Sequence, residues 1–134
     1  MIEREDVMVK IEGIYKDVLD KTEWVAIVTQ GEDGPHIVAT WGDYVRLLLK
    51  ENDEIIIPVG TYNKTEENLK KNKNIQLLIA SKQAKGSNSP GQGCRLRGEG
   101  EIQKEGEIVQ KVKEKFSWAR GALIIRVKEI DTLL

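Results

Sequence analysis

A lysine and a threonine stand at the start of an expected helix in the segment GTYNKTEENLK, directly after an expected strand. The first turn of a helix carries free backbone N–H groups and the positive end of the helix dipole, and both attract an anion. Lys64 would add a full positive charge, and the hydroxyl of Thr65 could donate a hydrogen bond to a phosphate oxygen. These residues predict a site for a single phosphate group.

The same segment also has a purely structural interpretation. Asn63 or Thr65 could cap the helix, while Glu66 and Glu67 complement its dipole. Local sequence alone favours this capping role, because the two carboxylates weaken an anion site unless they point away from it. The segment by itself leaves both interpretations open.

Few aromatic residues are available to stack on a planar ring. Trp41 and Tyr44 follow one expected strand and Trp118 precedes another, so flat surfaces could lie near the mouth of a barrel. A tryptophan taken alone is more often part of a core or an interface, and each position keeps that alternative.

The other residues with reactive side chains lack partners. His36 has no accompanying metal ligands or triad residues, so we expect it to be structural or solvated. Cys94 falls on the apolar side of its expected strand, and we expect it to pack rather than react. A single cysteine excludes an internal disulfide, and no clustered histidine accompanies it to form a zinc site. No pattern indicates a dedicated acid, base or nucleophile.

Charge and glycine patterns exclude several kinds of binding site. The formal net charge is -1, so no overall positive field draws the chain to nucleic acid or to an anionic membrane. The glycine-rich segment 82–93 is expected to be a long loop, and it matches neither a phosphate loop nor a dinucleotide fingerprint. Arg95 and Arg97 are expected to form cross-strand ion pairs in water.

The apolar pattern predicts short strands interspersed with helices. The expected helices cover residues 5–20, 66–71 and 108–116. The expected strands cover residues 24–30, 36–41, 54–60, 75–80, 94–102 and 121–127. This mainly β pattern favours an antiparallel barrel with helical covers over alternating βαβ units.

Length and the chain start give the remaining expectations. At 134 residues the chain fits one domain, residues 1–134. Its start lacks the order of a signal peptide, and no apolar run approaches the roughly 20 residues of a membrane span. We therefore expect a cytoplasmic protein.

Several sequence blocks carry a resemblance to a known family. From about Val25 to the C-terminus they are VAIVTQGEDGPHIV, TW, Tyr44, IIPVG, KTEENL, NSPGQG and WARGALII. In this order they resemble the small FMN-binding proteins of the pyridoxamine-phosphate-oxidase-like split-barrel group. The resemblance implies a six-stranded antiparallel split β-barrel, Greek-key-like, with covering helices. It also implies a homodimer with FMN at the interface.

The resemblance implies particular contacts for the phosphate and the ring of FMN. The phosphate should lie near Lys64 and Thr65, in agreement with the anion site inferred from the residues. Thr40 and Trp41 should line the isoalloxazine or ribityl region, and Trp118 should pack close by.

Further contacts are implied at the edge of the ring and from the second copy of the chain. Pro58, Val59 and Gly60 should offer backbone groups at the ring edge, and Leu134 should reach the flavin of the partner subunit. Relatives can carry Asn where this chain has Ala39, so a polar contact from that position is lost or replaced.

Three functions are compatible with these features. The first is an FMN protein that serves electron transfer with a redox partner protein or serves flavin storage. The second is a flavin reductase or a pyridoxamine-phosphate-oxidase-like oxidoreductase that uses NAD(P)H or a small substrate at the same site. The third is a cofactor-free barrel that binds oligonucleotides, but the net charge and the sparse aromatics count against it.

Overall fold

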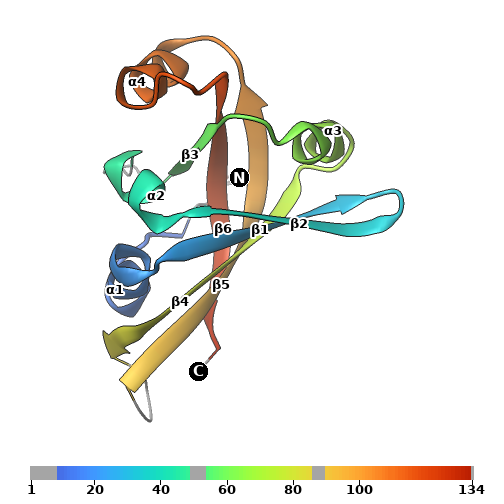
Figure 1. The fold of residues 1–134 in the computed structure, drawn as a ribbon. Coiled ribbons are helices and arrows are strands. Elements are labelled where there is room, and N and C mark those ends of the chain that lie inside the picture. Colours follow the sequence, from blue (N-terminus) through green and yellow to red (C-terminus); the bar gives the residue numbers. More distant parts are fainter. Residues whose placement is uncertain (1–8, 49–53, 86–89, 134) are drawn as a thin grey trace, which may run out of the picture.

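The sheet holds all the strands in one antiparallel arrangement. The computed structural model describes residues 9–48, 54–85 and 90–133. Its strand order is β2-β1-β4-β5-β6-β3 (Figure 1). The strands are β1 (Trp24–Gly31), β2 (Gly34–Trp41), β3 (Ile55–Val59), β4 (Asn74–Lys85), β5 (Pro90–Gln103) and β6 (Gly121–Thr132). The expected six-stranded antiparallel, mainly β fold is confirmed.

Four helices in the described residues surround the sheet (Figure 1). They are α1 (Ile14–Lys21), α2 (Gly42–Leu48), α3 (Asn63–Lys71) and α4 (Glu107–Lys115). None of these helices has the length and apolar character required to cross a membrane.

The sheet curls but leaves two edges, β2 and β3, which makes it a split half-barrel. β5 pairs with both β4 and β6, and its pairing with β6 shifts register between Arg97 and Gly98. A Cβ on Gly98 would lie 2.0 Å from the carbonyl oxygen of Arg126, so only glycine allows this close approach. Pro58, which was expected at an edge or a bulge, lies on the edge strand β3 opposite Ala122.

Two apolar clusters hold the fold together. The larger fills the inside of the curled sheet and includes Ile27, Ile57, Leu77 and Ile125. The smaller lies on the other face of β3 and β6, where Val112 of α4 and its neighbours cover the sheet. The two clusters thus cover the apolar faces of the β-branched strands and keep them from water.

The expected helix over residues 5–20 is wrong in its first half. α1 begins at Ile14, after Gly13 adopts φ 61°, a conformation that favours glycine and does not continue a helix. Val9 instead donates its backbone N–H to the carbonyl of Val127 at 2.9 Å, so this segment lies beside β6. Met8, which was assigned to the apolar stripe of the helix, lies outside the described residues.

Two other expectations are also corrected. Most of the expected loop over residues 82–93 belongs to a hairpin, because β4 continues to Lys85 and pairs there with Pro90 at the start of β5. The three expected helices omitted α2, whose short sequence buries Val45 and Leu48 against the sheet. Seven residues give too little periodicity to predict a helix.

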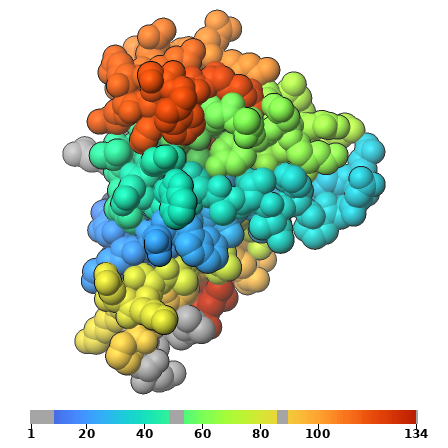
Figure 2. All heavy atoms as spheres, in the orientation of Figure 1, coloured from blue at the N-terminus to red at the C-terminus, as the bar shows by residue number. Residues whose placement is uncertain are grey.

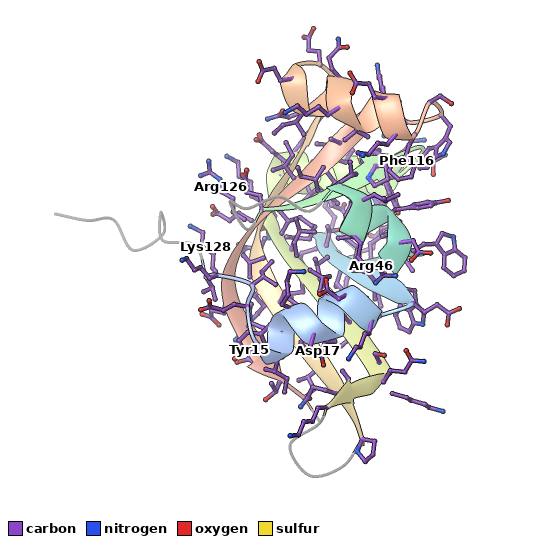
Figure 3. The ribbon with its side chains drawn as sticks, turned by 90° about the vertical axis from the view of Figure 1, so that its left-hand side faces the viewer. Tyr15, Asp17, Arg46, Phe116, Arg126 and Lys128 are labelled. Atoms are coloured by element: carbon purple, nitrogen blue, oxygen red, sulfur yellow. The ribbon has the colours of Figure 1, made fainter. Side chains whose placement is uncertain are left out.

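Arg46 joins α2 to the end of α1. Its guanidinium donates hydrogen bonds of 2.9 Å to the carbonyls of Leu19 and Thr22, and it pairs with Asp43 at 2.5 Å. Figure 3 shows Arg46 between the two helices. One carbonyl in the last turn of α1 and the carbonyl of its C-cap residue are thereby satisfied, and the segment that leads into β1 is fixed relative to α2.

Candidate functional site

A pocket of about 360 Å³ lies where the sheet does not close. Its walls come from both edge strands and from the segments that follow β3 and precede β6. The lining residues are Trp24, Ala39, Thr40, Trp41, Tyr44, Pro58, Gly60, Thr61, Tyr62 and Trp118. On the face shown in Figure 2, the teal β2–α2 segment, the green β3–α3 segment and the orange-red segment after α4 adjoin one another. The volume falls within the usual range for small-molecule sites.

Two tryptophans from the β1–β2 hairpin form one aromatic wall. Trp24 and Trp41 are directly opposite each other in the register of the hairpin, so their side chains share one face. They are 47% and 55% exposed, respectively. Half-exposed indoles of this kind leave flat apolar surface free for a ligand or a partner.

Trp118 forms the facing aromatic wall. Its ring packs against Tyr44 and Phe116, with centroid distances of 5.7 and 5.6 Å. A Cβ on Gly60 would lie 3.3 Å from the indole, so the absence of a side chain at Gly60 lets the ring rest on the end of β3. Even so, Trp118 remains 51% exposed and presents surface to the pocket.

The pocket offers hydroxyl groups, and among the described residues no charged side chain lines it. Thr40, Tyr44, Thr61 and Tyr62 carry the hydroxyls. The Tyr62 hydroxyl donates a hydrogen bond of 3.3 Å to the carbonyl oxygen of Ala39. Burial raises the pKa of Tyr62, so the group stays a neutral donor at physiological pH.

The first turn of α3 adjoins the pocket and keeps one polar atom without a partner. Thr65 is fully buried, and among the described residues its Oγ1 has no hydrogen-bond partner. A buried hydroxyl in this state is costly unless a ligand or water completes it. The orphaned atom at a helix N-terminus fits the phosphate group expected there.

Lys64 is not among the residues that line the aromatic pocket. It lines a separate hollow of about 200 Å³ between α3 and the β1–β2 hairpin, together with Lys71 and Glu32. Lys71 pairs with Glu32 at 2.8 Å, whereas Lys64 is exposed in the first turn. Lys64 therefore stands beside the helix N-terminus, one residue beyond Asn63, where α3 begins.

A charged network fixes the N-terminus of α3 to the strands. Glu66 pairs with Lys104 at 3.0 Å and with Arg120 at 2.9 Å, and its side chain is 11% exposed. Arg120 also donates hydrogen bonds to the carbonyls of Gly60 and Thr61. The hydrogen bond from Lys104 and, to a smaller extent, the hydrogen bond from Arg120 hold the pKa of Glu66 below its usual value of 4.5. Glu66, one of the two carboxylates expected to weaken an anion site, is thus ionised and paired with two cations.

We expect Glu66→Gln to reduce the free energy of unfolding at pH 7 by about 1 to 2 kcal/mol, because it removes a charged hydrogen-bond partner. Since the folded-state pKa of Glu66 is lowered, its contribution to the free energy of unfolding is complete above the unfolded-state pKa near 4.5. It is lost as the pH falls through the folded-state pKa. Urea unfolding of both proteins at pH 7 and at several pH values below 4.5 measures the difference. Glu105→Gln, in the exposed turn before α4, serves as the control, and equal losses in the two variants would contradict the prediction.

Of the expected FMN contacts, five line the pocket: Thr40, Trp41, Pro58, Gly60 and Trp118. The others lie elsewhere. Val59 is fully buried in the core, and its carbonyl accepts the backbone N–H of Arg120. Lys64 and Thr65 lie in the first turn of α3 beside the pocket, and Leu134 lies outside the described residues.

Sequence reasoning missed three lining residues: Trp24, Thr61 and Tyr62. A signal for Trp24 was available, because the tight turn that pairs Gly31 with Gly34 also sets Trp24 opposite Trp41. Tyr62 carried no such signal, since its position depends on how the chain turns from β3 into α3.

The expectations for Cys94 and the two arginines are confirmed. Cys94 is fully buried, and burial raises the pKa of its thiol to about 11, as suits a packing residue. Arg95 pairs with Asp131 at 3.0 Å and Arg97 pairs with Glu129 at 2.6 Å, so the partners lie across the strands on β6.

Comparison with known proteins identifies the family. The family model described as pyridoxamine 5'-phosphate oxidase matches residues 11–132. The chain belongs to this family. It is 37% identical over 122 residues to the protein named "FMN-binding protein" of Nitratidesulfovibrio vulgaris (strain DSM 19637 / Miyazaki F), which spans 91% of this chain and 98% of that protein. The expected resemblance is therefore confirmed.

Solved structures of the same fold are more distant in sequence. HupZ of Group A Streptococcus superposes with a TM-score of 0.73 at 23% identity, over 92% of this chain and 99% of that one. An FMN-binding protein from Syntrophomonas wolfei superposes with a TM-score of 0.62 at 15% identity, over 88% of this chain and 82% of that one. At these identities the likeness shows the fold alone.

Proposed function

We propose that this member of the pyridoxamine 5'-phosphate oxidase family binds FMN in the pocket between β2 and β3. The observation that carries the proposal is the pairing of an aromatic pocket with a neighbouring helix N-terminus that holds an orphaned buried hydroxyl, Thr65 Oγ1. A flavin mononucleotide needs apolar walls for its ring and a single anchor for its phosphate. The name of the relative from N. vulgaris supports the same cofactor.

The residues present divide between the two ends of FMN. Trp24, Trp41 and Trp118 would hold the ring system, and Thr40 would lie beside it on β2. The backbone N–H groups of the first turn of α3, with Thr65 and Lys64, would hold the phosphate. Bound FMN would supply one- and two-electron chemistry.

We further propose that two copies of the chain pair through the outer face of the β1–β2–β4 sheet and close the pocket between them. This face carries Ile37, which is 66% exposed, and Leu78, together with Trp24 and Trp41 from the pocket wall. The register places Ile37 opposite Val28, and both Ala39 and Leu78 opposite Ala26, so these side chains point the same way. A continuous apolar face of this kind is typical of an interface.

A second copy suits this face better than an unrelated protein does. On β5 and β6 the apolar face is followed by a row of charged side chains. In this row Arg95 on β5 pairs with Asp131 on β6, and Arg97 pairs with Glu129. A surface that carries charges of both signs beside an apolar patch can complement itself across a two-fold axis. The pocket opens on the same face, because Trp24 and Trp41 belong to both.

The proposed role is electron transfer or flavin storage. Within the described residues, the pocket is lined by no histidine, carboxylate, lysine or arginine that could act as an acid or a base on a substrate. Apolar walls bind and orient a flavin and exclude water from it, and they leave the chemistry to the cofactor.

Reconstitution with FMN tests the proposal. The protein should take up one FMN per chain, retain it through gel filtration and show a flavin absorption spectrum. FAD and riboflavin serve as comparison ligands. Absence of binding at micromolar FMN would contradict the proposal. Anaerobic addition of NADH or NADPH then separates the two roles, because persistent yellow colour favours a carrier and rapid bleaching favours a reductase.

A further inference from the structure

Tyr62 is held in a conformation that its residue type disfavours. Its backbone lies at φ 54° and ψ 36°, and it is the only non-glycine residue with positive φ in the part of the chain that the structure describes. For a bulky side chain this left-handed conformation is rare and costs free energy. A strained residue that lines a pocket indicates that the site requires its side chain there.

The residues on both sides of Tyr62 are fixed by Arg120. The guanidinium Nε donates to the carbonyl oxygens of Gly60 and Thr61, at 3.0 and 3.1 Å, and a terminal nitrogen also binds the Thr61 carbonyl. Another hydrogen bond of 3.4 Å reaches Oδ1 of Asn63. The turn from β3 into α3 is thereby determined by contacts outside Tyr62, which explains how the strained backbone persists.

The side chain of Tyr62 crosses the open edge of the half-barrel. Its backbone belongs to the segment after β3, but its hydroxyl donates to the carbonyl of Ala39 on β2, the opposite edge strand. The same hydroxyl lies in hydrogen-bonding reach of the Thr40 side chain. Ala39 itself offers no polar side-chain atom to the pocket, so the hydroxyls of Tyr62 and Thr40 are the side-chain donors at this part of the wall.

We propose that Tyr62 is the residue that hydrogen-bonds the edge of the flavin ring in this chain. When FMN binds, the Tyr62 hydroxyl donates its hydrogen bond to an acceptor on the ring instead of to the Ala39 carbonyl. This inference rests on the proposed function. The hydroxyl is a neutral donor set among aromatic walls, where a hydrogen bond is stronger than in water. The contact makes Tyr62 a determinant of ring binding rather than of phosphate binding.

Tyr62→Phe tests the inference, because it removes only the hydroxyl and keeps the ring and the backbone. We expect the Kd for FMN to rise about 3- to 10-fold, and the Kd for riboflavin to rise by the same factor, since both share the ring. The visible absorption maximum of the bound flavin should shift. The midpoint potential should fall, because a donor to the ring stabilises the electron-rich reduced form. Tyr15→Phe is the matched control, since Figure 3 shows Tyr15 on α1, far from Phe116 beside the pocket.

Other results would overturn the inference in distinguishable ways. If Tyr62→Phe binds both flavins as the wild type does, with the same spectrum, the hydroxyl does not contact the ring, although FMN binding itself stands. If the variant binds more weakly but keeps the spectrum and the potential, Tyr62 acts only on the shape of the pocket. If the wild type binds no FMN at all, the proposed function fails first.

Discussion

Lys64→Ala is expected to weaken FMN binding by about 1 to 3 kcal/mol, or roughly 5- to 150-fold in Kd. The lysine stands in the first turn of α3, where the helix dipole and the free N–H groups already favour an anion. Removal of its charge leaves the phosphate with neutral donors alone. Fluorescence titration of FMN into the apoprotein measures the change.

Two comparisons make this prediction specific to the phosphate. Riboflavin lacks that group, so its affinity should be the same in the variant and the wild type. Lys71→Ala removes a lysine from the same hollow, but at the last turn of α3, where it pairs with Glu32. Lys71→Ala should leave FMN affinity unchanged. Equal FMN affinity in Lys64→Ala and the wild type would place the phosphate elsewhere.

Ile37→Glu is expected to separate the proposed dimer. Ile37 is 66% exposed on the apolar outer face, and it does not line the pocket. In a two-fold interface each copy would bury an unpaired carboxylate, at a cost of roughly 3 to 5 kcal/mol. The dimer dissociation constant should rise about 100-fold or more, and FMN affinity should fall with it because the pocket loses its cover. Sedimentation measures the assembly, and flavin titration measures the affinity.

Leu47→Glu is the matched control for this change. Leu47 is 57% exposed on α2 and does not belong to the strands that form the outer face. The substitution adds the same charge in place of a similar exposed aliphatic side chain, and it should affect neither assembly nor FMN binding. A wild-type protein that sediments as a monomer with FMN bound would contradict the shared pocket. A dimeric Ile37→Glu protein would place the interface on another surface.

Local patterns in the sequence predicted most of the strands and the anion site. The β-branched runs gave the β1 and β3 segments, and alternation gave β5. The start of α3 was expected at a lysine and a threonine, and the buried, unpartnered Thr65 hydroxyl supports the anion site inferred there. These features depend on neighbours within a few residues, which is why the sequence alone carries them.

Features that depend on distant segments were decided only by tertiary structure. The pocket exists because β2 and β3, which lie at the two ends of the strand order, leave an open edge between them. Arg120 reaches back to Gly60 and Thr61, and this long-range contact fixes the turn that holds Tyr62 in its strained conformation. No local pattern encodes such a contact, since its geometry follows from the pairing of β3 with β6. The sequence by itself thus determined most of the strands and predicted an anion site at the start of α3, whereas the walls of the pocket and the position of Tyr62 required the folded sheet.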